Sequence, residues 1–138
     1  MTVVITDKGF GSDDLKVTFV ALGDAANSVA ALDVPSDADL PDLDAHLNAD
    51  VIRVDFPSSA DGRGFTIARQ LRLKGFKGRL RARGHVIADQ YAMARRSGFD
   101  EVEISDELAA RQPEDQWLFR ANWQQHDYQN RLRAKAAE

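Results

Sequence analysis

The sequence of 138 residues contains no cysteine, and this absence excludes several classes of site. Without thiols the chain cannot form a disulfide, offer a cysteine nucleophile, anchor an iron–sulfur cluster or build a cysteine-based zinc site. Its three histidines, His46, His85 and His126, fall in different predicted elements and show no spacing typical of metal ligands. The sequence therefore predicts no metal site, and any redox chemistry would need a bound cofactor or a partner.

Long hydrophobic runs are missing as well. No apolar stretch approaches the roughly 18 residues that a membrane-spanning helix requires, and the chain does not open with a charged segment followed by a long apolar core. We therefore expect a cytoplasmic protein that does not enter the membrane. A full dinucleotide-binding glycine pattern and a Walker lysine are also lacking, so the sequence indicates no particular cofactor and leaves its presence open.

Positive charge is scarce outside the middle of the chain. The formal net charge is −4, yet residues 63–96 hold ten of the 18 Lys and Arg residues and a single acid, Asp89. Residues 1–62 hold three bases and twelve acids, and five bases and nine acids follow residue 96. With a pI of about 5.3 the chain is a poor candidate for nucleic-acid binding. A basic middle segment suits a small anion or an acidic protein partner better.

The pattern of the chain predicts an α/β fold in one domain spanning residues 1–138. A hydrophobic content of 43% suffices for one core. Between residues 29 and 104, short apolar runs alternate with segments of helical spacing, and residues 51–56 are apolar at nearly every position, as in a strand covered on both faces. Strands that alternate with helices predict about four βα units, arranged as a mainly parallel sheet or a half-barrel.

The two ends flank this repeating core. We expect residues 1–28 to form an N-terminal edge and residues 105–138 to form C-terminal helices, with Ser105 capping a short helix and Pro113 opening a long one. The long helix would present an apolar stripe made of Trp117, Ala121, Tyr128 and Leu132. Surplus aromatic residues on its Phe119–Trp123 side, and the open edges of a half-barrel, predict a homodimer.

The first candidate site is the loop formed by Asp61, Gly62, Arg63 and Gly64, which follows the strand at 51–56 and opens a helix. Loops at the carboxyl ends of parallel strands bind ligands in open sheets and barrels alike. Backbone N–H groups at a helix start, together with an arginine fork, suit sulfate, sulfite or phosphate. Alternatively, Asp61 only caps the helix, the glycines only permit the turn and Arg63 is solvated. The motif is short, so the anion hypothesis depends mainly on the charge distribution.

A second candidate site lies at the equivalent corner of the next unit. Alternation along residues 79–83 places Leu80 and Ala82 on one face and three arginines on the other, outside the core. The last of these, Arg83, is followed by a glycine and His85, and by geometry this corner should neighbour Arg63, which makes Arg83 a further predicted anion ligand.

His85 is the candidate proton donor, although a single loop histidine is more often an ordinary surface residue. Asp89, four residues later, could orient His85 or pair with Arg63 or a strand arginine, and the ion pair is favoured. A third candidate, for docking, is the outer surface of the helix after Gly64. Its Arg69, Arg72 and Lys74 either remain solvated or dock an acidic electron carrier or reductase.

Three segments occur in order: FPSSADGRGFTIARQLR, GRLRARGHVIADQ and RRSGFDEVEI, with Tyr128-Gln129 near the end. Through them the chain resembles the DUF934 family of uncharacterised bacterial proteins, best over residues 51–104. Family members accompany the enzymes of assimilatory sulfate reduction and are described as oxidoreductases of sulfite reduction. Many carry an acid where this chain has His85, so no family role transfers to that position.

The resemblance implies a pathway and leaves open whether the protein is an enzyme. One hypothesis is an oxidoreductase or accessory component of sulfite or sulfate reduction with an anion-facing site at the carboxyl ends of the strands. Its ligand would be a small sulfur oxyanion or a phosphate-bearing molecule. The alternative is a non-catalytic binding module that docks to sulfite reductase or a neighbouring enzyme through the basic helix.

Overall fold

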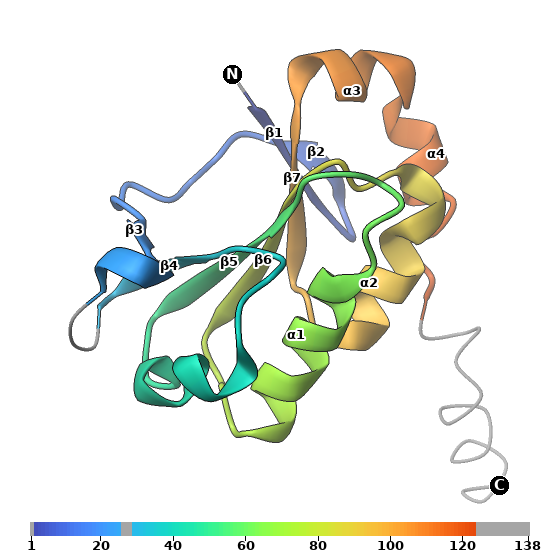
Figure 1. The fold of residues 1–138 in the computed structure, drawn as a ribbon. Coiled ribbons are helices and arrows are strands. Elements are labelled where there is room, and N and C mark those ends of the chain that lie inside the picture. The colour runs from blue at the N-terminus through green and yellow to red at the C-terminus, as the bar shows by residue number, and fades with distance from the viewer. Residues whose placement is uncertain (1, 26–28, 124–138) are drawn as a thin grey trace, which may run out of the picture.

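The computed structural model of the chain describes residues 2–25 and 29–123, which form one seven-stranded sheet in the order β2-β1-β7-β6-β5-β4-β3 (Figure 1). Its strands are β1 Thr2–Thr6, β2 Gly9–Gly11, β3 Val20–Ala21, β4 Ala31–Val34, β5 Val51–Phe56, β6 Arg79–Gly84 and β7 Glu101–Ser105. Strands β3 to β7 are parallel, whereas β1 is antiparallel to both β7 and β2. The predicted α/β class with a mainly parallel sheet is therefore confirmed.

The helical segments are α1 Arg63–Leu73, α2 Tyr91–Ser97, α3 Asp106–Arg111 and α4 Glu114–Leu118, with 3₁₀ turns η1 Leu22–Asp24, η2 Leu40–His46 and η3 Ala88–Gln90. After β4 the chain forms the 3₁₀ segment η2, so α-helices follow β5, β6 and β7 only, and four regular βα units are not formed. Leu40 and Leu43 are three residues apart, which suits the tighter period of a 3₁₀ helix. Among the described helices, none combines the length and apolarity that crossing a membrane requires.

Helices α1 and α2 contact each other and cover one face of the sheet, with η2 beside α1 (Figure 1). The strands present apolar rows to these helices: Leu32 pairs in register with Ile52, which pairs with Leu80, and all three are fully buried. On α1, the apolar residues Ile67, Ala68 and Leu71 recur at helical spacing, and all three are buried. The main core therefore lies between the sheet and these helices.

The opposite face of the sheet carries charged side chains. Asp33, Arg53, Arg81 and Glu101 are register neighbours across four strands. The three arginines of β6 lie on this face, outside the apolar core as predicted, but Arg81 is not exposed: it is fully buried and donates to Glu103 (2.8 Å) as well as to Glu101. Strand alternation determines the side to which a residue points, but it does not reveal that acids of a neighbouring strand and of residues 13–14 will cover it.

The predicted long C-terminal helix is not formed, because α4 ends at Leu118 after five residues. Trp117 belongs to the core at 1% exposure, whereas Phe119 is 74% exposed. Trp123 turns back toward the first hairpin, where its Nε1 donates to Asp7 (3.3 Å) and its ring lies against Arg95. Those contacts require the chain to bend after α4. Tyr128 and Leu132 of the predicted stripe lie outside the described residues.

Candidate ligand site at the carboxyl edge

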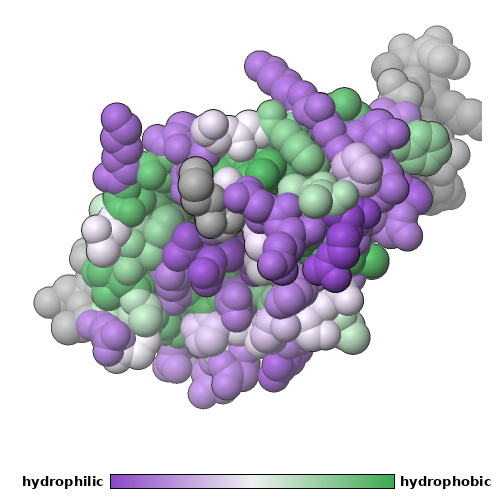
Figure 2. Space-filling view, turned by 90° about the horizontal axis from the view of Figure 1, so that it is seen from above, coloured by the Kyte–Doolittle hydropathy of each residue, from purple (hydrophilic) through white to green (hydrophobic). Residues whose placement is uncertain are grey.

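The parallel strands β4 to β7 all end at one edge of the sheet, and Figure 2 views the molecule from this edge, with hydrophilic residues across its middle. The loops after β5 and β6 are joined by two hydrogen bonds, from the backbone N–H of His85 to Phe56 O (2.9 Å) and from Gln90 Nε2 to Ser59 O (2.8 Å). Gly84 has a φ of +118°, and a Cβ there would lie 2.5 Å from Phe56 O. Glycine is therefore required where these two loops approach each other.

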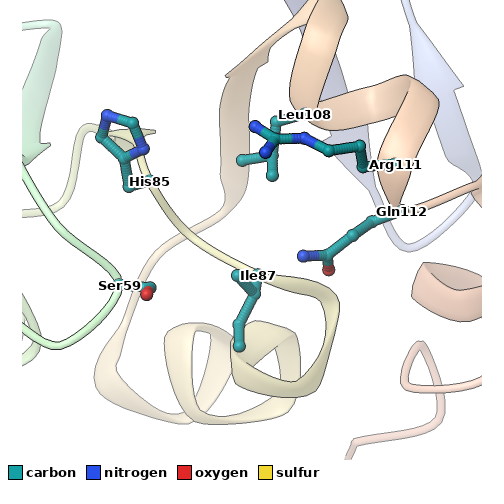
Figure 3. Close-up of a pocket in the computed structure, with 6 residues that line it drawn as sticks. All are labelled: Ser59, His85, Ile87, Leu108, Arg111 and Gln112. Atoms are coloured by element: carbon teal, nitrogen blue, oxygen red, sulfur yellow. The ribbon is translucent and has the colours of Figure 1, made fainter.

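The first hollow at this edge has a volume of about 300 Å³ and is lined by Ser59, His85, Ile87, Leu108, Arg111 and Gln112 (Figure 3). Arg111 extends from α3 toward the loop that carries His85. Gln112 is fixed, because its Oε1 accepts a hydrogen bond from the backbone N–H of Ala88 (2.5 Å). No described group pairs with the side chains of His85 or Arg111. Both therefore remain available to a ligand.

A second hollow of about 310 Å³ adjoins the first, because His85 lines both. Arg83 and Asp55 lie in it, with Glu103 and Ser105 from β7. The Arg83 side chain is 48% exposed and forms an ion pair with Glu103, in which the nearest atoms, Nε and Oε2, lie 3.3 Å apart. Within the described residues its two terminal nitrogens donate no hydrogen bond. They can thus form the bidentate fork that suits an oxyanion.

A third hollow of about 230 Å³ continues on the other side of Asp55 and Arg83, toward residues 21–23 and β4. Neighbouring hollows share His85, or Asp55 and Arg83, and together we call them the carboxyl-edge groove. The deeper charges of this third hollow are already paired, since Arg53 binds Asp33 through two hydrogen bonds of 2.6 and 2.8 Å. Burial alone would lower the pKa of Arg53, but the bonds and charge of Asp33 raise it. Within the described residues, the charged groups of the groove that retain capacity for a ligand are therefore Arg83, Arg111 and Asp55.

The predicted anion loop is engaged internally. Arg63 donates three hydrogen bonds to the Asp61 carboxylate, from its own backbone N–H (3.1 Å), Nε (3.0 Å) and Nη2 (2.7 Å). These bonds hold the pKa of Asp61 below its usual range. Arg63 also donates to Ser36 (3.1 Å) and lines a hollow with Thr66, away from Arg83 and His85. Arg63 and Arg83 therefore line different hollows and are not the neighbours that the sequence predicted.

The glycines of that loop differ in role. Gly64 is buried and lies directly on the Phe56 ring, which a Cβ at this position would strike. At Gly62 a Cβ would meet nothing closer than the Phe65 ring at 4.0 Å. Gly64 therefore permits the close packing of α1 on the sheet, whereas a larger side chain could be accommodated at position 62.

Asp89 does not contact His85. Its carboxylate pairs with Arg120 (3.0 Å) and lines a separate hollow with Asp115 and Phe119. The expected partners, Arg63 or a strand arginine, are therefore wrong. The fold explains the difference, because the segment after α4 brings Arg120 to the start of η3, a contact that local helical spacing cannot indicate.

The basic helix surface is also largely engaged. Arg72 donates to the carbonyl oxygens of Gly78 (2.8 Å) and Gly98 (2.9 and 3.0 Å) and pairs with Asp100 (3.0 Å). Lys74 pairs with Asp44 (2.6 Å) and donates to the carbonyl oxygen of Leu40 (3.1 Å). Of the three predicted docking residues, only Arg69 is exposed without a described partner.

Sequence reasoning missed Asp55 and Arg111. Asp55 had a signal, because an acid next to the last position of a buried strand stands where parallel sheets bind ligands. Arg111 had none, since only the fold of α3 over the edge brings it near His85. No cluster of three or more potential metal-binding side chains occurs in the described part of the chain.

A family model described as "Bacterial protein of unknown function (DUF934)" matches residues 31–137, and the chain therefore belongs to this family. The resemblance seen in the sequence is thereby confirmed. No curated protein and no solved structure matches the chain.

Proposed function

We propose that this member of the DUF934 family serves assimilatory sulfite reduction, as an oxidoreductase or accessory component that binds a small oxyanion in the carboxyl-edge groove. The observation that carries the proposal is a pair of arginines, Arg83 and Arg111, whose terminal guanidinium nitrogens donate no hydrogen bond to a described residue. They enter adjoining hollows that share His85. The pathway comes from the family resemblance, and the chemistry of the groove supports the oxyanion.

Arg83, Arg111 and His85 carry groups that can bind an oxyanion or transfer a proton to it. Two guanidinium groups can grip an oxyanion such as sulfite or a phosphate group from two sides. His85, which lines both hollows, carries an imidazole that can hold or supply a proton. Electrons for a reduction would have to come from a bound cofactor or a partner protein, because the chain has no cysteine. Asp61, Gly62, Arg63 and Gly64 have a lesser claim as ligands, since Arg63 is paired with Asp61.

The proposal is tested by calorimetric titration of the full chain with sulfite, sulfate and phosphate. We expect Arg83→Ala to weaken binding by at least about tenfold and Arg111→Ala to weaken it less, while Arg69→Ala, a matched loss of one exposed arginine, changes nothing. Failure of the wild-type protein to bind any of the three anions would overturn the anion site.

The pathway is tested separately by deleting the gene and supplying sulfate or sulfide as the sole sulfur source. We expect the deletion to slow growth on sulfate only, with rescue by the wild-type gene and by Arg69→Ala but not by Arg83→Ala. Equal growth on both sulfur sources would reject the link to sulfite reduction.

The docking alternative has narrower support, because Arg72 and Lys74 are tied to carbonyl oxygens and acids of the same chain. Arg69→Glu is the appropriate test, since it reverses an exposed charge without breaking an internal contact. If this variant lost sulfite reductase from affinity capture while Arg83→Ala retained it, the binding-module hypothesis would replace the oxyanion site.

We also propose that the protein is a homodimer. Three apolar side chains, Met93 on α2 and Leu118 and Phe119 at the end of α4, are 52%, 43% and 74% exposed. Light scattering after gel filtration should give twice the 15.3 kDa mass of the chain. Phe119→Ser should lower that value, and a single-chain mass for the wild type would reject the dimer.

A further inference from the structure

We infer that the carboxyl-edge groove takes a short zwitterion, whose ammonium group pairs with Asp55 and whose acid group pairs with Arg83. An amino acid and an aminosulfonate both have this chemistry. The inference rests on the oxyanion site proposed above, and it adds a cationic group to the ligand that the site selects.

The observation behind it is the isolation of Asp55. The other acids on the charged face of the sheet are paired: Asp33 with Arg53, Glu101 with Arg79 and Arg81, and Glu103 with Arg53, Arg81 and Arg83. Asp55 is half-buried and has no hydrogen bond or ion pair to any described residue. It is therefore the one acid of this face, within the described residues, that lacks a cation.

The isolation is notable because Asp55 has an arginine beside it. Asp55 and Arg83 are direct register partners on β5 and β6. Arg83 nevertheless points its Nε to Glu103 on its other side. Its terminal nitrogens and the Asp55 carboxylate thus stand next to each other without pairing, and both line the second and third hollows.

These two groups favour a zwitterion over a simple anion. A half-buried carboxylate without a partner costs free energy, and an anion bound by Arg83 would lie close to it and be repelled. A ligand that also carries an ammonium group would supply the missing cation. The same two side chains would then contribute favourably at both ends of the ligand.

The spacing limits the length of the ligand. Neighbouring parallel strands lie about 4.8 Å apart, and the two residues are at the same level along them. An ammonium and an acid group separated by one to three carbon atoms match this distance. The second hollow, of about 310 Å³, has room for such a molecule.

The test uses two matched pairs of probes in calorimetric titrations of the full chain. In each pair the members differ only in the ammonium group: 2-aminoethanesulfonate with ethanesulfonate, and 3-aminopropanoate with propanoate. We expect the wild-type protein to bind the ammonium-bearing member of at least one pair about tenfold more tightly. The pair that shows the larger difference identifies whether the acid group is a sulfonate or a carboxylate.

Two variants separate this inference from the proposed function. Asp55→Asn, which keeps the size of the side chain, should abolish the preference for the ammonium group and leave binding of the plain anions unchanged or stronger. Arg83→Ala should weaken both members of each pair. Asp42→Asn, at an exposed acid outside the groove, is the matched control and should change neither.

The outcomes are distinct. Equal binding of both members of each pair by the wild-type protein, or a preference that survives in Asp55→Asn, would overturn the zwitterion and leave the oxyanion site standing. Absence of binding for all four probes together with sulfite, sulfate and phosphate would overturn both.

Discussion

The two faces of the sheet are built from the same strands, but one is stabilised by burial of apolar side chains and the other by ion pairs. On β5, Ile52, Val54 and Phe56 point to the helices, whereas Arg53 and Asp55 point to the charged face. Burial of apolar area is non-directional and tolerates small shifts. Ion pairs removed from water stabilise only when each charge meets its partner in good geometry. The charged face is therefore the more sensitive one to substitution, and the charges at its carboxyl edge that have no partner in the described part of the chain form the candidate site.

The largest effect should come from breaking the centre of the charged face. Arg81→Met keeps most of the side-chain volume but leaves Glu101 and Glu103, both almost fully buried, without their central partner. We expect a loss of about 3–5 kcal/mol in the free energy of unfolding, measured by urea denaturation. Arg79→Met, at a side chain 31% exposed, is the matched control and should cost clearly less. Equal losses would mean that burial does not set the cost on this face.

The apolar face is tested by adding one methyl group. Gly64→Ala would place a Cβ against the Phe56 ring where α1 meets β5, and overpacking of this kind costs about 1–3 kcal/mol. Gly62→Ala, two residues earlier in open space, should change the unfolding free energy by less than about 0.5 kcal/mol. If the two variants were equally stable, the close approach of α1 to β5 would be wrong.

The contribution of Asp7, which lies at the edge of the apolar face, to the free energy of unfolding should depend on pH. Asp7 accepts hydrogen bonds from the buried Tyr91 hydroxyl (2.5 Å) and from Arg95. Burial alone would raise the pKa of Asp7, but these bonds lower it below the ordinary value of 3.8. A carboxyl group with a lowered folded-state pKa stabilises the protein above its unfolded pKa, and this stability is lost as the pH falls through the folded-state pKa.

Wild-type protein should therefore be more stable than Asp7→Asn at pH 7 and should lose that advantage below about pH 4, in urea denaturation across a pH series. An advantage that stayed constant down to about pH 2 would show that ionised Asp7 is not the stabilising form.

The smallest effect is expected where the charged face meets solvent. Asp14 pairs with Arg79 (2.7 Å), but its side chain is 65% exposed. Asp14→Asn should cost about 0.2–1 kcal/mol at low salt, and the difference should shrink as salt screens the pair. A loss as large as that of Arg81→Met would remove the distinction between the buried and exposed pairs of this face.

The local sequence pattern was sufficient to predict features that depend only on residues within one helix or strand. The apolar run at 51–56, the inward residues of α1 and the Ser105 cap, whose hydroxyl accepts the backbone N–H of Leu108 (3.2 Å), were all predictable. Gly98, which ends α2, has a φ of +118°, the left-handed conformation for which glycine is favoured after a helix. Each depends on neighbours within a few residues, and the sequence displays those directly.

Pairings over long sequence distances were not predictable. The arginines were all visible as a basic segment, but their partners come from other elements: Arg81 meets acids of β7 and the stretch before β3, and Arg72 meets the carbonyl oxygen of Gly98. For the same reason the sequence could not show that Arg72 and Lys74, two of the three docking residues predicted on α1, form contacts within the chain. A charge pattern predicts where cations are, and tertiary structure decides which of them are already neutralised.

Amino-acid sequence alone was enough to give the α/β class, the positions of most strands and helices, the family, and the absence of cysteine chemistry. Those properties follow from residue type and local period. The three-dimensional arrangement was needed to show that Arg63 is paired with Asp61. It was also needed to show that, among the described residues, the terminal nitrogens of Arg83 and Arg111 donate no hydrogen bond and Asp55 has no ion pair although an arginine is its register neighbour. The reason is physical: availability of a charged group depends on what lies within a few ångströms of it, and chain order does not specify that distance.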